Sequence, residues 1–162
     1  MQFDAQVHRL AEVLTARGWR LSTAESCTGG LVAAACTAVP GSSDWFERGF
    51  VTYSNQAKVD MLGVPASLIE RHGAVSAQVA QAMALGALAH APAELAVAVT
   101  GIAGPSGATP GKPVGTVWLA LARRGAGCDT QQLQLDGDRS AVREQTVARA
   151  LQWCVERGVS GR

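Results

Sequence analysis

A serine stands in a turn between a short strand-like run and an apolar helical run. The turn, residues 25–30, has the sequence Glu-Ser-Cys-Thr-Gly-Gly. Free backbone N–H groups and the positive end of the helix dipole converge at such a position, which suits a phosphate, an oxyanion or an activated hydroxyl. Ser26 can therefore be a nucleophile, a phosphate ligand or only a helix cap. Glu25, three residues after Ser22, offers capping chemistry as well.

The two glycines of this turn favour a functional role over simple capping. Gly29 and Gly30 let the backbone approach a ligand closely, which a cap does not require. Together with Cys27 and Thr28 they supply backbone N–H groups that could hold an oxyanion. Cys27 could also be a reactive thiol at a helix N-terminus; a small buried core residue is the alternative.

A tyrosine and a lysine further along the chain could supply a base. Tyr53 ends a strand predicted over residues 49–53, and Lys58 falls in the first turn of a helix predicted over residues 55–62, with Ser54 as its N-cap. A cation there faces an unfavourable dipole, and partial burial would lower its pKa. A neutral lysine can take a proton from a serine, and a tyrosine hydroxyl can relay or orient that proton. The alternative is a solvated lysine and a tyrosine at a strand end.

The longest predicted loop, residues 101–113, follows a continuous apolar strand and contains four glycines and three prolines. Ligands of α/β proteins bind at the ends of such strands, so Thr100, Gly101 and Gly104 are candidates to contact one. The spacing of the glycines fits neither the P-loop nor the dinucleotide-binding motif.

Three cations are candidates to hold a phosphate. Arg139 opens the last predicted helix and could bind a phosphate bidentately, and Arg143 lies one turn further on. Lys112 stands at the end of the glycine-rich loop. An exposed arginine in a turn is the default alternative for Arg139, and the sequence does not decide among the three.

Apolar periodicity and turn signals place these residues on an α/β framework. Helices are predicted over residues 4–17, 31–39, 55–62, 67–72, 77–91 and from 138 or 140 to 157; strands are predicted over residues 19–24, 49–53, 95–100, 114–122 and 128–135. Alternating helices and strands with a hairpin near the end predict one domain over residues 1–162. Its expected architecture is a three-layer α/β/α sandwich with a mixed central sheet.

Composition narrows the class of protein. A net charge of +1 gives no electrostatic reason to expect nucleic acid or a membrane surface as a partner. No apolar run approaches the roughly 20 residues of a spanning helix, and the first residues lack the features of a secretory signal. The four cysteines form no C-x-x-C pair, which predicts reduced thiols and a cytoplasmic location. The three histidines lack zinc-binding spacing, so we expect no metal site.

Five segments, in this order along the chain, resemble the CinA C-terminal domain family. They are residues 23–30, 41–55, 73–76, 100–105 and 112–117. Because several separate motifs agree, the resemblance is highly specific, and it covers nearly the whole chain, from the first helix through Arg139. The chain resembles the stand-alone form of the family, which lacks the molybdopterin-binding-like domain of full CinA proteins.

The resemblance implies an activity and a site. Enzymes of the family are nicotinamide-nucleotide amidohydrolases, which convert nicotinamide mononucleotide and water to nicotinate mononucleotide and ammonia. The family's catalytic serine, tyrosine and lysine correspond to Ser26, Tyr53 and Lys58, and Thr100 and Arg139 are implied as further site residues. No metal or cofactor is expected, and compact α/β enzymes of this size commonly form homodimers. Two alternatives remain: a nucleotide-binding module without catalysis, and a serine amidase for another small amide.

Overall fold

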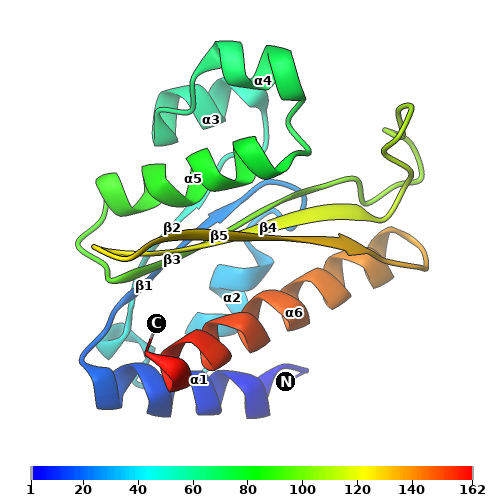
Figure 1. Cartoon of the computed structure of the whole chain (residues 1–162). Coiled ribbons are helices and arrows are strands. Elements are labelled where there is room, and N and C mark those ends of the chain that lie inside the picture. Colours follow the sequence, from blue (N-terminus) through cyan, green and yellow to red (C-terminus); the bar gives the residue numbers. More distant parts are fainter. Residues whose placement is uncertain (1, 162) are drawn as a thin grey trace.

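A computed structural model describes residues 2–161 and shows a five-stranded sheet with helices on both faces (Figure 1). The helices are α1 (Asp4–Arg17), α2 (Leu31–Thr37), the 3₁₀ helix η1 (Ser42–Asp44), α3 (Asn55–Leu62), α4 (Ala66–His72), α5 (Ala77–Ala89) and α6 (Arg139–Ser160). The strands are β1 (Leu21–Glu25), β2 (Phe46–Val51), β3 (Leu95–Gly101), β4 (Thr116–Arg123) and β5 (Gly127–Gln134). The predicted domain, residues 1–162, extends one residue beyond the described part at each end.

The sheet is mixed, with strand order β2-β1-β3-β4-β5. Strand β1 runs parallel to β2 and β3, whereas β4 is antiparallel to both β3 and β5. Helices α3, α4 and α5 cover one face, and α1, α2 and α6 cover the other (Figure 1). This arrangement confirms the predicted three-layer sandwich. It also brings the carboxyl ends of β1, β2 and β3 to one edge, where the candidate residues lie.

Helix α5 determines how closely α3 approaches the sheet. Its core face consists largely of alanines, together with Gly86. A Cβ added at Gly86 would lie 2.1 Å from the carbonyl oxygen of Leu62, the last residue of α3. The two helices therefore meet backbone to backbone at this point, and this packing fixes the height of α3, which carries Lys58, above the sheet.

Three strands have a boundary that differs from the sequence prediction by two or more residues. Strand β1 begins at Leu21, not at residue 19, because the Arg20 N–H donates to the Glu94 carboxylate (2.5 Å). Strand β2 covers Phe46–Val51, not residues 49–53, because the chain leaves the sheet to enter the cap of α3. Strand β4 begins at Thr116 after a turn, not at residue 114, and η1 was not predicted.

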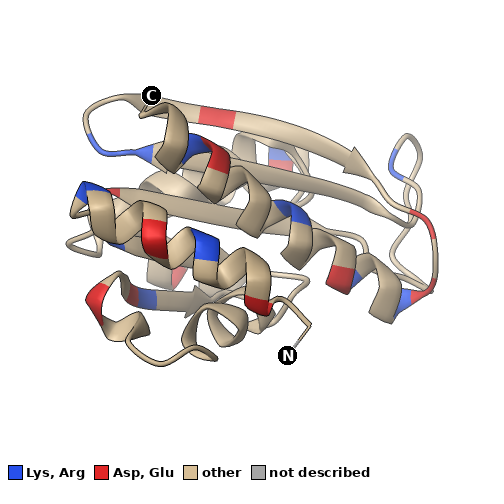
Figure 2. Cartoon of the chain, turned by 90° about the horizontal axis from the view of Figure 1, so that it is seen from below, with Lys and Arg blue, Asp and Glu red and all other residues tan. Residues whose placement is uncertain are grey.

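Charged residues are distributed evenly over the face formed by α1 and α6. Figure 2 shows Lys and Arg interspersed with Asp and Glu along both helices. Within residues 2–161, no helix combines the length and hydropathy that crossing a bilayer requires.

Candidate active site

The Lys58 ammonium lies 3.0 Å from the Ser26 hydroxyl oxygen. Ser26 directly follows β1, where its N–H donates to the Val99 carbonyl of β3 (2.9 Å). Lys58 lies in the first turn of α3, whose N-terminus is capped by Ser54 as predicted: its hydroxyl accepts the Ala57 N–H. Parallel pairing of β1 and β2 brings these elements together, although the two residues are 32 positions apart in sequence.

Lys58 is buried in a cage of main-chain oxygens. Its side chain is 1% exposed, and Nζ donates to the carbonyls of Thr52 (3.0 Å), Tyr53 (3.2 Å) and Ser54 (3.4 Å). No carboxylate forms an ion pair with it in the part of the chain described. Burial lowers the pKa of Lys58, because desolvation disfavours the ammonium form, and the nearby Cys27 thiol opposes this shift. The burial on which a lowered pKa was expected to depend is therefore present, and the alternative of a solvated lysine is wrong.

Tyr53 contributes to this arrangement through its backbone. Its carbonyl accepts hydrogen bonds from Lys58 and, at 3.3 Å, from the Ser26 hydroxyl. Its side chain, by contrast, is 60% exposed, and the phenol oxygen accepts a hydrogen bond from Arg139 Nη2 (3.1 Å). The phenol thus lies at the mouth of the site. Nothing in the sequence indicated that the Tyr53 carbonyl would accept a hydrogen bond from the lysine.

Glu25 holds the turn after Ser26. Its carboxylate accepts hydrogen bonds from the Thr28 hydroxyl (2.5 Å) and from the N–H groups of Val32 (2.9 Å) and Ala33 (3.0 Å) at the start of α2. Ser22 is not part of this cap, since its hydroxyl donates to the Arg48 carbonyl. The sequence indicated that Glu25 could cap a helix, but it did not show that the cap encloses the serine.

Cys27, Thr28, Gly29 and Gly30 differ in what they face. Cys27 lines the cavity beside Ser26, and burial raises the pKa of its thiol to about 11. That value favours the interpretation as a small core residue over a reactive thiolate. Thr28 is fully buried against Glu25. Gly29 and Gly30 have φ of 58° and 107°, so they form the turn in the left-handed region. Unlike Cys27, the residues Thr28, Gly29 and Gly30 do not line the cavity.

A cavity of about 340 Å³ opens in front of Ser26. Ser26, Cys27, Tyr53 and Arg139 line it together with parts of the loop 101–107, including Gly101 and Gly104. Thr100 does not reach it: this side chain is buried, and its hydroxyl donates to the Ala74 carbonyl (2.8 Å). Among the predicted loop residues, the structure therefore brings Gly101 and Gly104 to the site and leaves Thr100 behind it. Ser106 and Gly107, which also line the cavity, were not predicted.

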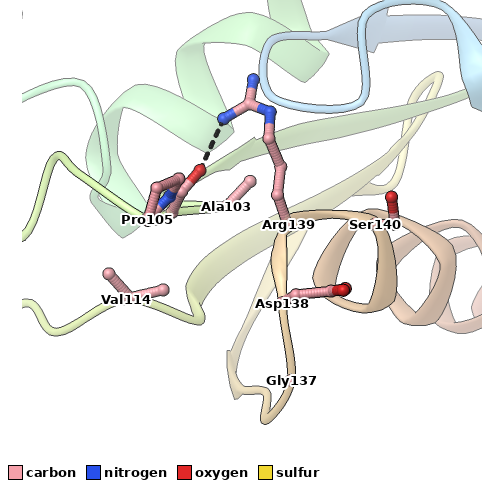
Figure 3. Close-up of a pocket in the computed structure, with 8 residues that line it drawn as sticks. Ala103, Pro105, Val114, Gly137, Asp138, Arg139 and Ser140 are labelled. Carbon is pink, nitrogen blue, oxygen red and sulfur yellow. Dashed lines mark hydrogen bonds between the residues drawn. The ribbon is translucent and has the colours of Figure 1, made fainter.

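Arg139 stands between this cavity and a second one. Its Nη1 donates to the Gly104 carbonyl (2.9 Å), and Figure 3 shows the guanidinium reaching from the start of α6 toward that oxygen. The second cavity, about 320 Å³, is lined by Pro105, Val114 and residues 137–140, and it shares Arg139 with the first. Arg139 is therefore positioned to contact a ligand that extends away from Ser26.

The other two candidate cations are occupied elsewhere. Arg143 donates to the carbonyls of Cys27 (3.1 Å) and Thr28 (3.4 Å), so it supports the turn from the side of α6. Lys112 donates to the His72 carbonyl (2.7 Å) and lines a different cavity. Among the described residues, no group of three His, Cys, Asp or Glu side chains is placed to hold a metal ion.

The fold and the site together define a three-layer α/β protein with a serine–lysine pair at the carboxyl edge of its sheet. A model of the CinA C-terminal domain matches residues 4–157, and the chain belongs to this family.

Relatives and solved structures agree with this assignment. Nicotinamide-nucleotide amidohydrolase PncC of Escherichia coli K12 is 54% identical over 153 residues, which cover 94% of this chain and 90% of the relative. A CinA-like protein of Citrifermentans bemidjiense is 57% identical over 145 residues, covering 90% of this chain but 35% of the relative, so the chain spans about a third of that protein. The crystal structure of a competence/damage inducible protein from Agrobacterium tumefaciens superposes with a TM-score of 0.92 at 45% identity, covering 96% of this chain and 95% of that one.

Proposed function

We propose that this protein hydrolyses the carboxamide of nicotinamide mononucleotide to nicotinate mononucleotide and ammonia, a step of pyridine nucleotide salvage. The observation that carries the proposal is the buried Lys58 amine 3.0 Å from Ser26, on a cavity that also contains Arg139. The names of near full-length relatives, such as the Escherichia coli enzyme, support the same reaction. The catalytic unit is one domain over residues 1–162.

Lys58 acts as the base in its neutral form. A neutral amine keeps two N–H groups, which the carbonyls of Thr52 and Tyr53 can accept, and it gains a lone pair toward Ser26. The serine proton moves to Nζ as Oγ attacks the carboxamide carbon. The resulting ammonium is stabilised by the same carbonyls, so the cage suits both states of the lysine. Lys58 then returns the proton to the departing ammonia, and water cleaves the acyl-enzyme.

The turn after Ser26 supplies a donor for the oxyanion. The Gly29 N–H is already used, because it donates to the Ser26 carbonyl (3.0 Å). Of the other residues of the turn, Cys27 alone lines the Ser26 cavity, so its N–H is the candidate donor.

Arg139 binds the phosphate of the nucleotide. Among the three candidate cations it alone lines the Ser26 cavity. The cavity volume of about 340 Å³ lies at the lower end of the range for small-molecule sites, roughly 300–1,000 Å³. The Tyr53 phenol, bonded to Arg139, orients the substrate from the mouth of the site. A proton relay through this phenol would require it to leave Arg139 and approach Lys58.

The test is ammonia release from nicotinamide mononucleotide, with a metal chelator present, by the unaltered protein and by Ser26→Ala. We expect release by the unaltered protein only, and retained nucleotide binding by Ser26→Ala in calorimetry. Ser67→Ala, at an exposed serine of α4, is the matched control and should keep full activity. Ammonia release by Ser26→Ala would refute the nucleophile assignment.

Two other results would support the alternative functions. Nucleotide binding without ammonia release by any variant would indicate a binding module. Equal turnover of nicotinamide riboside, which lacks the phosphate, would indicate a serine amidase of broader specificity.

A further inference from the structure

We propose that Glu25 is a positioning residue, which holds Ser26 at attacking distance from its base. The inference concerns the same reaction and rests on the proposed function. Glu25 is a buried carboxylate that the mechanism above does not use, and it touches both elements that create the Ser26–Lys58 pair.

The side chain of Glu25 closes a ring around the serine. Glu25 is 1% exposed, and the three hydrogen bonds of its carboxylate reach Thr28, Val32 and Ala33. Ser26 lies inside the segment that these bonds enclose. A buried carboxylate is costly unless its oxygens are hydrogen-bonded, so turn and carboxylate stabilise each other. No lysine or arginine forms an ion pair with it among residues 2–161.

The main chain of Glu25 reaches the cage of Lys58. Its carbonyl accepts the Thr52 N–H (2.8 Å), and the Thr52 carbonyl accepts a hydrogen bond from Lys58 Nζ (3.0 Å). One residue therefore fixes the nucleophile through its side chain and the base through its backbone. Arg143 supports the same turn from outside, at the carbonyl of Cys27.

An ordinary helix cap does not require this arrangement. Helix N-caps are usually short side chains at the N-cap position itself. Here that position is Gly30, which has no side chain, and the cap comes from the strand before the turn. The fold thus uses the capping bonds of α2 to constrain the five-residue connection that carries Ser26.

The decisive variant is Glu25→Gln, which keeps the size of the side chain. The glutamine carbonyl can accept from Thr28 and Val32, but its NH₂ group would face the Ala33 N–H, donor against donor. Misplacement of reacting groups by about 1 Å costs on the order of 100-fold in rate. We expect kcat for nicotinamide mononucleotide to fall about 10- to 100-fold with KM within about twofold. Glu70→Gln, at an exposed glutamate of α4, is the matched control and should behave as the unaltered protein.

Active-site titration separates positioning from stability. A fluorophosphonate that labels reactive serines counts competent sites and reports their labelling rate without any nucleotide. Positioning predicts full labelling at a reduced rate and a reduced kcat per labelled site. If Glu25→Gln loses sites but keeps kcat per site, or keeps kcat entirely, the proposal is overturned.

Thr28→Val is the second variant, for use if Glu25→Gln does not fold. It removes only the hydroxyl that donates to Glu25. We expect a slower labelling rate and lower kcat, and unchanged values of both would overturn the proposal. If the unaltered protein is labelled but releases no ammonia from nicotinamide mononucleotide, the proposed function fails, and the labelling rates still decide the role of Glu25.

Discussion

Replacement of Lys58 by methionine removes the proposed base and keeps an unbranched side chain that is one atom shorter. A positioned general base contributes typically about 10²- to 10⁴-fold, or about 3–5 kcal/mol of activation free energy. Lys58 lies 3.0 Å from Ser26, and no other side-chain amine or carboxylate among the described residues hydrogen-bonds to that hydroxyl. We therefore expect ammonia release to fall by at least about 100-fold.

The stability of Lys58→Met should change little by comparison. The substitution leaves three carbonyls without their shared donor, which is costly, but it also removes a buried cation that has no carboxylate partner within the described chain. We expect the free energy of unfolding in urea to change by no more than about 2 kcal/mol, because the two effects oppose each other.

The assay compares ammonia release, nucleotide binding by calorimetry and urea unfolding on the same preparations. Lys112→Met changes the other lysine, which bonds to a carbonyl outside the Ser26 cavity, and should keep activity within about twofold. Activity of Lys58→Met within tenfold of the unaltered protein, with the fold intact, would refute Lys58 as the base.

Three further predictions concern the pKa of Lys58, the role of Arg139 and the packing of α5 against α3. Because the pKa of Lys58 is lowered, kcat/KM should rise with pH as the amine loses its proton, and it should level off below the ordinary lysine pKa. The free energy of unfolding should also rise with pH between the lowered and the ordinary pKa, since in that range Lys58 is protonated only in the unfolded chain. A free energy of unfolding in urea that does not change across this range would contradict the prediction. Arg139→Gln should raise KM for nicotinamide mononucleotide about 10- to 100-fold and leave turnover of nicotinamide riboside unchanged, whereas an equal loss with both substrates would argue against phosphate binding. Gly86→Ala should destabilise the protein by about 1–3 kcal/mol in urea unfolding, because its Cβ would lie 2.1 Å from the Leu62 carbonyl, and an unchanged midpoint would show that α3 can shift at little cost.

Local sequence signals predicted most of the fold. The cap at Ser54 and the continuous apolar run of β3 are both present where the sequence predicted them. Such signals depend on neighbouring residues, so they can be seen without a structure. The boundaries of β1, β2 and β4 were less accurate, because they depend on hydrogen bonds to distant residues such as Glu94.

Only part of the site could be predicted from the sequence. The residue types of Ser26 and Lys58 suggested a nucleophile and a base, but their distance depends on the register between β1 and β2, which pairs Glu25 with Val51. The carbonyl cage around Lys58 depends on where the chain leaves the sheet. Every residue has a backbone carbonyl, so the residue types alone do not show which carbonyls accept from the lysine. Thr100 was expected to contact a ligand because it lies at the end of a buried strand. Its hydroxyl donates instead to the Ala74 carbonyl and does not reach the cavity.

In the sheet formed by residues 2–161, strand β2 lies at the edge and pairs only with β1. The segment from β2 into α3 carries every carbonyl of the Lys58 cage, so the proposed Ser26–Lys58 pair depends on this edge staying docked. Edge elements open with less free energy than the central strands of a domain. Inactivation on heating should therefore precede global melting, and amide hydrogen exchange in β2 should be faster than in β3. If Ser26 and Lys58 act as proposed, we expect the opening of this one edge strand, and not the stability of the core, to determine how long the protein stays active.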